Sequence, residues 1–135
     1  MCIYVRDLKK AMGFFSDLLG THFSEPMERH DVGMIMSYSP TGLTLAAPTG
    51  PDSFVAKTIE RRGEGVAIVA FKIPDIEEAA AHMTSRGVRI AERFSVGGVG
   101  NVEGVASHPN DTYGVMIDLN EYKEEHPIYS AMQEK

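Results

Sequence analysis

The sequence GVAIVAFKIPDIEEAAAHMTSRGV, residues 65–88, predicts a strand that runs directly into a helix. Its apolar run at 66–73 is typical of a buried strand, and Asp75 stands where a helix N-cap is expected. Apolar side chains then recur at helical spacing until Gly87, a typical residue at a helix C-terminus. The apolar run has no side chain that binds a metal or transfers a proton, so chemistry in this half must come from other residues.

The same order of strand, cap and helix opens the chain. VRDLKKA starts at residue 5 and IPDIEEA at residue 73, an offset of 68 residues. Three short β-prone segments follow each helix, at 21–26, 31–39 and 42–48 in the first half and at 88–92, 101–108 and 113–119 in the second. This pattern predicts a duplicated βαβββ unit. The alternative is that any strand, cap and helix in series look alike.

The predicted organisation is a single domain over residues 1–135 with an α+β fold. Its 135 residues, of which 43% are hydrophobic, suffice for one core. The parts expected are module one at 1–50, a connector helix at 51–64 capped by Asp52 or Ser53, module two at 65–119 and a C-terminal tail at 120–135.

Composition excludes several classes of partner. The net charge is −6 and no run concentrates the 13 Lys and Arg residues, so we expect neither nucleic acid nor an acidic membrane as partner. The first residues show no long apolar segment, and thus neither a signal peptide nor a membrane span is predicted. A single cysteine, Cys2, fits a reducing compartment. We expect a cytoplasmic protein.

Two sets of motifs resemble a known family. V-x-D-L-x-x-A at 5–11, followed by F-x-x-x-L-G at 15–20, resembles the vicinal oxygen chelate superfamily of glyoxalases, bleomycin-resistance proteins and extradiol dioxygenases. Residues 47–90 and SHPNDTYGVMIDL at 107–119 are similar to its methylmalonyl-CoA epimerase branch. The resemblance implies a cup-shaped, pseudo-symmetric mixed sheet made of the two modules. It also implies a small-molecule substrate or ligand and a homodimer.

The resemblance further implies four metal-ligand positions inside the cup. They fall immediately before Met1 and on Ala47, Ile68 and Asp118. A catalytic metal needs about three N or O ligands, and Ala and Ile supply none. We therefore expect no metal and no cofactor. The residues expected to contact the substrate are Ala47, Ile68, Met36 and Met116.

Three residues are candidates for acid–base catalysis. Alternation along 113–119 puts Asp118 and Met116 on one face of a strand, which the resemblance implies is the cup face. A carboxyl group among apolar side chains is suited to proton transfer; a surface Asp at a strand end is the alternative. The resemblance implies a second carboxylate near Glu28. His108, in a turn-rich loop, is a proton carrier or a part of the scaffold.

Two functions remain open from the sequence, and a degenerate interaction subunit is a third. The first is a small-molecule isomerase, epimerase or lyase that uses metal-independent acid–base chemistry. The second is a metal-free small-molecule binding protein of the bleomycin-resistance type, which would explain the apolar replacements directly. The Gly-rich stretch at 94–101 does not open a helix, so it is no dinucleotide motif and predicts a hairpin or a lip over the cup.

Overall fold

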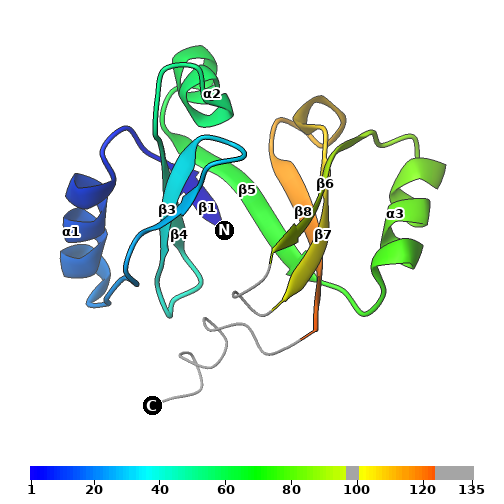
Figure 1. The fold of residues 1–135 in the computed structure, drawn as a ribbon, viewed down its shortest axis with the longest axis horizontal. Helices are drawn as coiled ribbons and strands as arrows, with labels where there is room; N and C mark the ends of the chain where they lie inside the picture. The colour runs from blue at the N-terminus through cyan, green and yellow to red at the C-terminus, as the bar shows by residue number, and fades with distance from the viewer. Residues whose placement is uncertain (97–100, 124–135) are drawn as a thin grey trace. The chain divides into compact units, whose positions relative to one another are not determined.

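The computed structural model describes residues 1–96 and 101–123, which divide into two compact units between Val66 and Ala67. The first unit contains β1 (Cys2–Tyr4), α1 (Leu8–Leu19), β2 (Met27–Arg29), β3 (Met34–Tyr38), β4 (Thr44–Pro48) and α2 (Phe54–Arg62) (Figure 1). The second half contains β5 (Gly65–Lys72), α3 (Ile76–Ser85), β6 (Ile90–Val96), β7 (Val102–Ser107), the short 3-10 helix η1 (Pro109–Asp111) and β8 (Met116–Tyr122).

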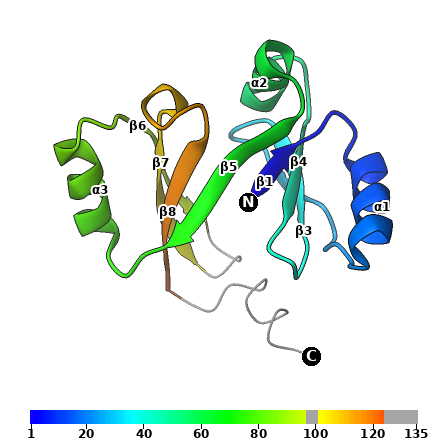
Figure 2. The same ribbon diagram turned by 180° about the vertical axis from the view of Figure 1, so that it is seen from behind.

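The two modules have the same strand order and directions. In module one the order is β2-β3-β4-β1, with β1 parallel to β4 and the other neighbours antiparallel. In module two it is β6-β7-β8-β5, with β5 parallel to β8 and the others antiparallel (Figures 1 and 2). The predicted α+β fold of two βαβββ modules is confirmed.

One helix covers one face of the strands in each module. Between α1 and the strands of module one the core contains Val5, Leu8, Leu45 and Ala47, and between α3 and the strands of module two it contains Ile76, Ala80, Met83 and Val105. Because side chains alternate along a strand, the residues between these core positions project from the opposite face. Within the described residues, no helix is long and apolar enough to cross a membrane.

The helix caps repeat with the modules. The Asp7 carboxylate accepts a hydrogen bond from Lys10 N at 3.1 Å, and the Asp75 carboxylate accepts one from Glu78 N at 3.0 Å. Each satisfies a backbone donor that has no partner inside its helix. In α2 the cap is Ser53, whose Oγ accepts from Ala56 N at 3.0 Å. The sequence had left Asp52 and Ser53 as alternatives, and the structure selects Ser53.

Removing either repeated cap should lower stability by a similar amount. We expect Asp7→Ala and Asp75→Ala each to reduce the free energy of unfolding by about 1 kcal/mol, measured by urea denaturation. Asp52→Ala is the matched control and should stay within about 0.5 kcal/mol of the parent. A cap variant indistinguishable from Asp52→Ala would contradict the assignment.

Two of the expected strands differ in the structure. Residues 21–26 do not form the expected strand; β2 lies after Pro26, which has no N–H to donate to a ladder. The last strand extends to Tyr122, beyond the expected module end at 119. Half of the predicted lip, at 97–100, and most of the predicted tail, at 124–135, lie outside the described residues.

Candidate functional site

Asp118 projects from the face of module two that lies opposite α3. Its neighbour Leu119 packs beneath α3, so alternation turns Asp118 to the other side. Asp118 lies between Ala70 of β5 and Ala106 of β7, its register partners. The residue is half-buried and its Oδ1 is withdrawn from water. Both neighbours carry only a methyl side chain; Ala70 is exposed, whereas Ala106 is 1% exposed.

Other side chains of this face mix apolar and polar groups. Residues paired across neighbouring strands project from the same face of the sheet. The register therefore identifies the other residues on the face of Asp118, along β5 and β8 and across β7 to β6. Its members include Ile68, Lys72, Met116 and Asn120 from β5 and β8, and Glu92 and Phe94 from β6. We call this set, with Asp118, Ala70 and Ala106, the Asp118 face. It carries two carboxylates, one ammonium group and one carboxamide on an otherwise largely apolar surface.

Asn120 is held tightly on the Asp118 face. It is 7% exposed, and its Nδ2 donates to the Tyr122 hydroxyl at 3.3 Å. Its Oδ1 is buried and accepts no hydrogen bond from the described residues. The partner across the ladder is Gly104, where a Cβ would stand 2.5 Å from that oxygen and overlap the Phe94 ring. Glycine is therefore required here by close approach of two side chains.

The repeat identifies the module-one counterpart of Asp118. Val5 N donates to the carbonyl of Ala46 at 2.9 Å, and its counterpart Ile73 N donates to the carbonyl of Asn120 at 2.8 Å. Counting two residues back along β4 and β8 pairs Thr44 with Asp118. Thr44 is 9% exposed and faces away from α1. It was not among the residues selected from the sequence.

Ala47 lies elsewhere than expected. It is 3% exposed and belongs to the core cluster beneath α1, on the side of β4 opposite to Thr44. Ala47 was selected because the resemblance implies a ligand just before a proline, here Pro48, whereas the hydrogen-bond register fixes the position three residues earlier. In this register Thr44, and not Ala47, is the counterpart of Asp118. The other three residues expected to contact substrate, Ile68, Met36 and Met116, do face away from the helices.

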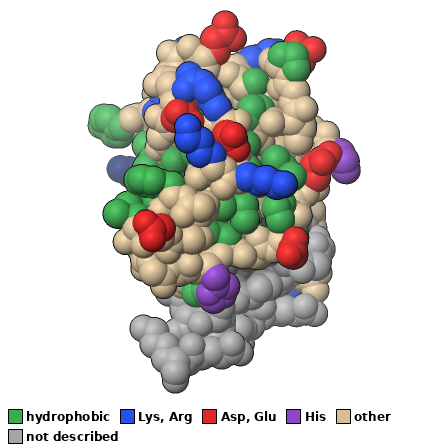
Figure 3. Space-filling view, turned by 90° about the vertical axis from the view of Figure 1, so that its left-hand side faces the viewer, with side chains coloured by type: hydrophobic (Ala, Val, Ile, Leu, Met, Phe, Trp, Pro, Cys, Tyr) green, Lys and Arg blue, Asp and Glu red, His purple; other side chains and the backbone are tan. Residues whose placement is uncertain are grey.

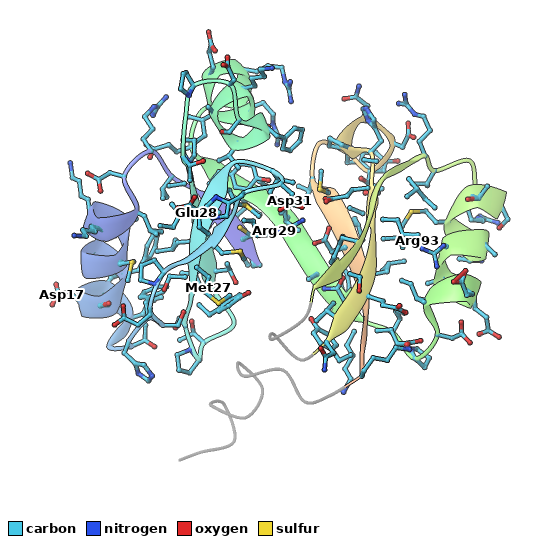
Figure 4. All side chains as sticks on the ribbon, viewed as in Figure 1. Asp17, Met27, Glu28, Arg29, Asp31 and Arg93 are labelled. Carbon is cyan, nitrogen blue, oxygen red and sulfur yellow. The ribbon has the colours of Figure 1, made fainter. Side chains whose placement is uncertain are left out.

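Glu28 does not join Thr44 on its face of module one. It pairs across the ladder with Ile35, which packs against the α1 cluster, and so projects to the α1 side. Its side chain is 42% exposed and its Oε2 contacts His30 Nδ1 at 2.7 Å. The flanking residues Met27 and Arg29 are on the other face of β2 (Figure 4). Glu28 therefore interacts with His30 at the surface, on the side of β2 opposite to the face of Thr44.

His108 has a local structural contact. Its Nδ1 accepts a hydrogen bond from Asn110 N at 3.2 Å, which caps η1, and its own N–H donates to the Arg89 carbonyl at 2.8 Å. These contacts support the scaffold alternative. In the same turn the Asp111 carboxylate accepts hydrogen bonds from Nε and Nη2 of Arg89, the residue just before β6, at 2.9 and 3.0 Å.

The Arg89–Asp111 pair should make stability depend on acid pH. Hydrogen bonds from the Arg89 guanidinium and backbone N–H lower the pKa of Asp111 to about 2. An unfolded Asp has a pKa of about 3.9, so the contribution is fully present above about pH 4 and is lost as pH falls towards 2. We expect Asp111→Asn to melt below the parent at pH 6, with the difference vanishing near pH 2. A difference independent of pH would contradict this.

The described residues do not fit the metal site that the resemblance implies. Ile68 has no ligand atom, and Thr44 offers only a neutral hydroxyl in place of a strong ligand. Among the described residues, no three or more His, Cys, Asp and Glu side chains are grouped so that they could hold a metal ion. Asp118 therefore has to be considered for chemistry of its own.

Comparison with known proteins agrees with this architecture. The model of the Glyoxalase/Bleomycin resistance protein/Dioxygenase superfamily matches residues 1–103. The chain belongs to this superfamily. The human mitochondrial methylmalonyl-CoA epimerase is 27% identical to it over 126 residues, covering 90% of this chain and 71% of the human protein. Among superfamily members, the chain is thus epimerase-like.

Solved structures of superfamily members give the same result. The methylmalonyl-CoA epimerase of Mycobacterium tuberculosis is 28% identical with a TM-score of 0.78, over 90% of this chain and 84% of that one. A variant of the Streptomyces coelicolor methylmalonyl-CoA epimerase, in complex with 2-nitronate-propionyl-CoA, is 26% identical with a TM-score of 0.78, over 90% and 94%. The vicinal oxygen chelate fold expected from the motifs is confirmed.

Proposed function

We propose that the protein is an isomerase of the epimerase type that acts on a small acyl thioester and uses Asp118 as its acid–base group. The observation that carries the proposal is the half-buried Asp118 carboxylate between two alanines. The Streptomyces coelicolor relative binds a propionyl-CoA derivative, and another epimerase structure contains methylmalonyl-CoA. These ligands of related proteins support an acyl-CoA thioester as the substrate class.

The chemistry begins with a proton on the carbon next to the thioester carbonyl. The Asp118 carboxylate takes this proton, the C–H electron pair moves into the carbonyl, and an enolate with a negative oxygen forms. Hydrogen-bond donors aimed at that oxygen stabilise it, often by about 3 kcal/mol per donor. Lys72 and the Asn120 amide are the nearest donor groups in the register. We assign them this role.

Inversion at the carbon requires proton return from the opposite side. Glu92 stands two strands from Asp118 across Ala106, so their backbones are about 10 Å apart. We therefore propose Glu92 in the second acid–base role in place of Glu28. Ile68 and Met116 on the Asp118 face are proposed to contact the substrate. In module one, Met36 and Thr44 are candidate ligand contacts on the face opposite α1.

The reaction as proposed takes no metal, because the expected ligand positions hold Ile68 and Thr44 and the described residues do not fit one. We further propose that the protein acts in the cytoplasm as a homodimer.

A binding protein without catalysis is the second candidate function. It is favoured by three methionines, Met27, Met34 and Met36, that gather on the module-one face opposite α1. Flexible thioether side chains adapt to irregular apolar ligands.

Deuterium exchange separates these functions. The protein is incubated with methylmalonyl-CoA and other 2-substituted acyl-CoA thioesters in D2O, and deuterium at C2 is followed by NMR. An isomerase incorporates deuterium, a lyase also releases the group at C3, and a binding protein leaves the spectrum unchanged while the ligand still raises the melting temperature. No exchange with any thioester in the set would contradict the proposal.

A further inference from the structure

The outer face of α1 exposes large apolar side chains. Phe14 is 60% exposed and Leu18 is 62% exposed, one turn apart on the helix. The view onto α1 shows hydrophobic side chains gathered in the middle of this side of module one (Figure 3). Contiguous exposed apolar groups of this kind mark interaction surfaces in many proteins. We call Ala11, Phe14 and Leu18 the α1 stripe.

The second module supplies an internal comparison for the α1 stripe. At the repeat offset of 68 residues, Phe14 corresponds to His82 and Leu18 to Arg86. Both counterparts are exposed and belong to α3 or its C-cap. Polar residues at these positions are therefore compatible with a folded module. Folding therefore does not account for Phe14 and Leu18, the exposed apolar residues at these positions in α1.

We propose that α1 is the surface through which two copies of this chain pair, with the two helices antiparallel and crossing at Phe14. This assigns a surface to the homodimer proposed above and is independent of the catalytic role of Asp118. The charges of α1 favour a second copy as the partner. Lys10 precedes Phe14 and Asp17 follows it, both are exposed, and neither forms an ion pair with another described residue.

Helix geometry brings these charges together in the antiparallel pair. At about 100° and 1.5 Å per residue, Lys10 and Asp17 lie on one flank of Phe14, about 6 Å before it and 4.5 Å after it. A two-fold axis that passes between the helices at Phe14, perpendicular to both, reverses the direction of the second helix. The flank with Lys10 and Asp17 then lies on the same side of the pair in both copies. Lys10 of one copy therefore meets Asp17 of the other, about 1.5 Å apart along the axis. By the same operation Leu18 meets Ala11 on the other flank, so the apolar groups also match.

Sedimentation of the full chain tests the α1 stripe. One helix pair is small beside a typical stable interface, so we expect a dimer with a dissociation constant in the micromolar range. Phe14→His with Leu18→Arg, the residues found in α3, should weaken it about 100-fold. His82→Ala with Arg86→Ala is the matched control on α3 and should leave it unchanged. A parent that is monomeric at about 100 µM, or a folded stripe variant that dimerises like the parent, overturns the proposal.

A charge exchange tests the antiparallel arrangement without touching the apolar residues. Lys10→Glu alone and Asp17→Lys alone each place like charges together and should weaken the dimer severalfold. The double variant restores opposite charges across the two-fold axis and should recover the parent dissociation constant. This result decides the question if the stripe variant fails to fold. Single variants that dimerise like the parent, or a double variant that dimerises more weakly than either single variant, would contradict the antiparallel pairing.

Discussion

Replacing Asp118 by Asn should lower the rate of deuterium incorporation at C2 by about 10²- to 10⁴-fold, the usual contribution of a general acid or base. The amide has nearly the same shape but cannot accept the proton. Because the substitution keeps the size of the side chain and the register neighbours Ala70 and Ala106 are small, we expect the fold and the binding of the thioester to be retained. The measurement is the initial exchange rate at saturating thioester, with binding followed by calorimetry.

The matched control for this variant is Glu103→Gln. Glu103 lies on the next strand, β7, but on the side of the sheet opposite to Asp118, and it contacts Lys123 Nζ at 3.7 Å. The Glu103→Gln substitution also removes one negative charge but leaves the Asp118 face unchanged. Deuterium exchange at C2 should therefore proceed at the parent rate. If Asp118→Asn exchanges as fast as Glu103→Gln, Asp118 is not the acid–base group and the binding-protein function becomes the better description.

Gly104→Ala should be strongly destabilising although it adds only one methyl group. Its Cβ would overlap the Phe94 ring and stand 2.5 Å from Asn120 Oδ1, so both side chains would have to move. Overpacking of this kind costs about 1–3 kcal/mol, and the shift of Asn120 breaks its contact with Tyr122 as well. We expect a loss at the upper end of that range in urea denaturation, together with a slower exchange reaction.

Gly13→Ala is the matched control, because Gly13 lies within α1 and nothing is within 4 Å of its added Cβ. Alanine in a helix interior is better than glycine by about 0.5–1 kcal/mol, so this variant should be more stable than the parent. Two variants with the same chemical change should therefore shift the unfolding midpoint in opposite directions. A Gly104→Ala protein as stable as the parent would show that the Phe94–Gly104–Asn120 packing is wrong.

Local signals in the sequence predicted the elements of the fold. The Asp7 and Asp75 caps, the helical spacing after them and the alternation of the strands depend on neighbouring residues. The described residues contain the three expected α-helices and eight strands. The repeat of VRDLKKA as IPDIEEA also predicted the shared topology. Residues 21–26 were misassigned because their β-prone composition says nothing about which neighbour could complete a ladder.

The candidate site was harder to predict because its residues meet through strand register. Register is set by long-range backbone pairing, and a small error moves a side chain to the other face. For this reason Ala47 and Glu28 lie on the α1 side of their strands, while Asp118, chosen by alternation, lies on the face opposite α3. Thr44 could have been found by aligning TLAAP at 44–48 with DLNEY at 118–122 on their shared second residue, Leu, which pairs Thr44 with Asp118 without reference to Pro48.

The most direct test of the central claim is the metal dependence of C2 exchange. If Asp118 is the acid–base group on a face that holds no metal, then protein dialysed against chelator should incorporate deuterium at the same rate as untreated protein, and added Co²⁺ should change neither this rate nor the melting temperature. Metal bound to a native site would stabilise the folded state by mass action. Exchange that is lost after chelation and restored by about one equivalent of a divalent metal would contradict the account.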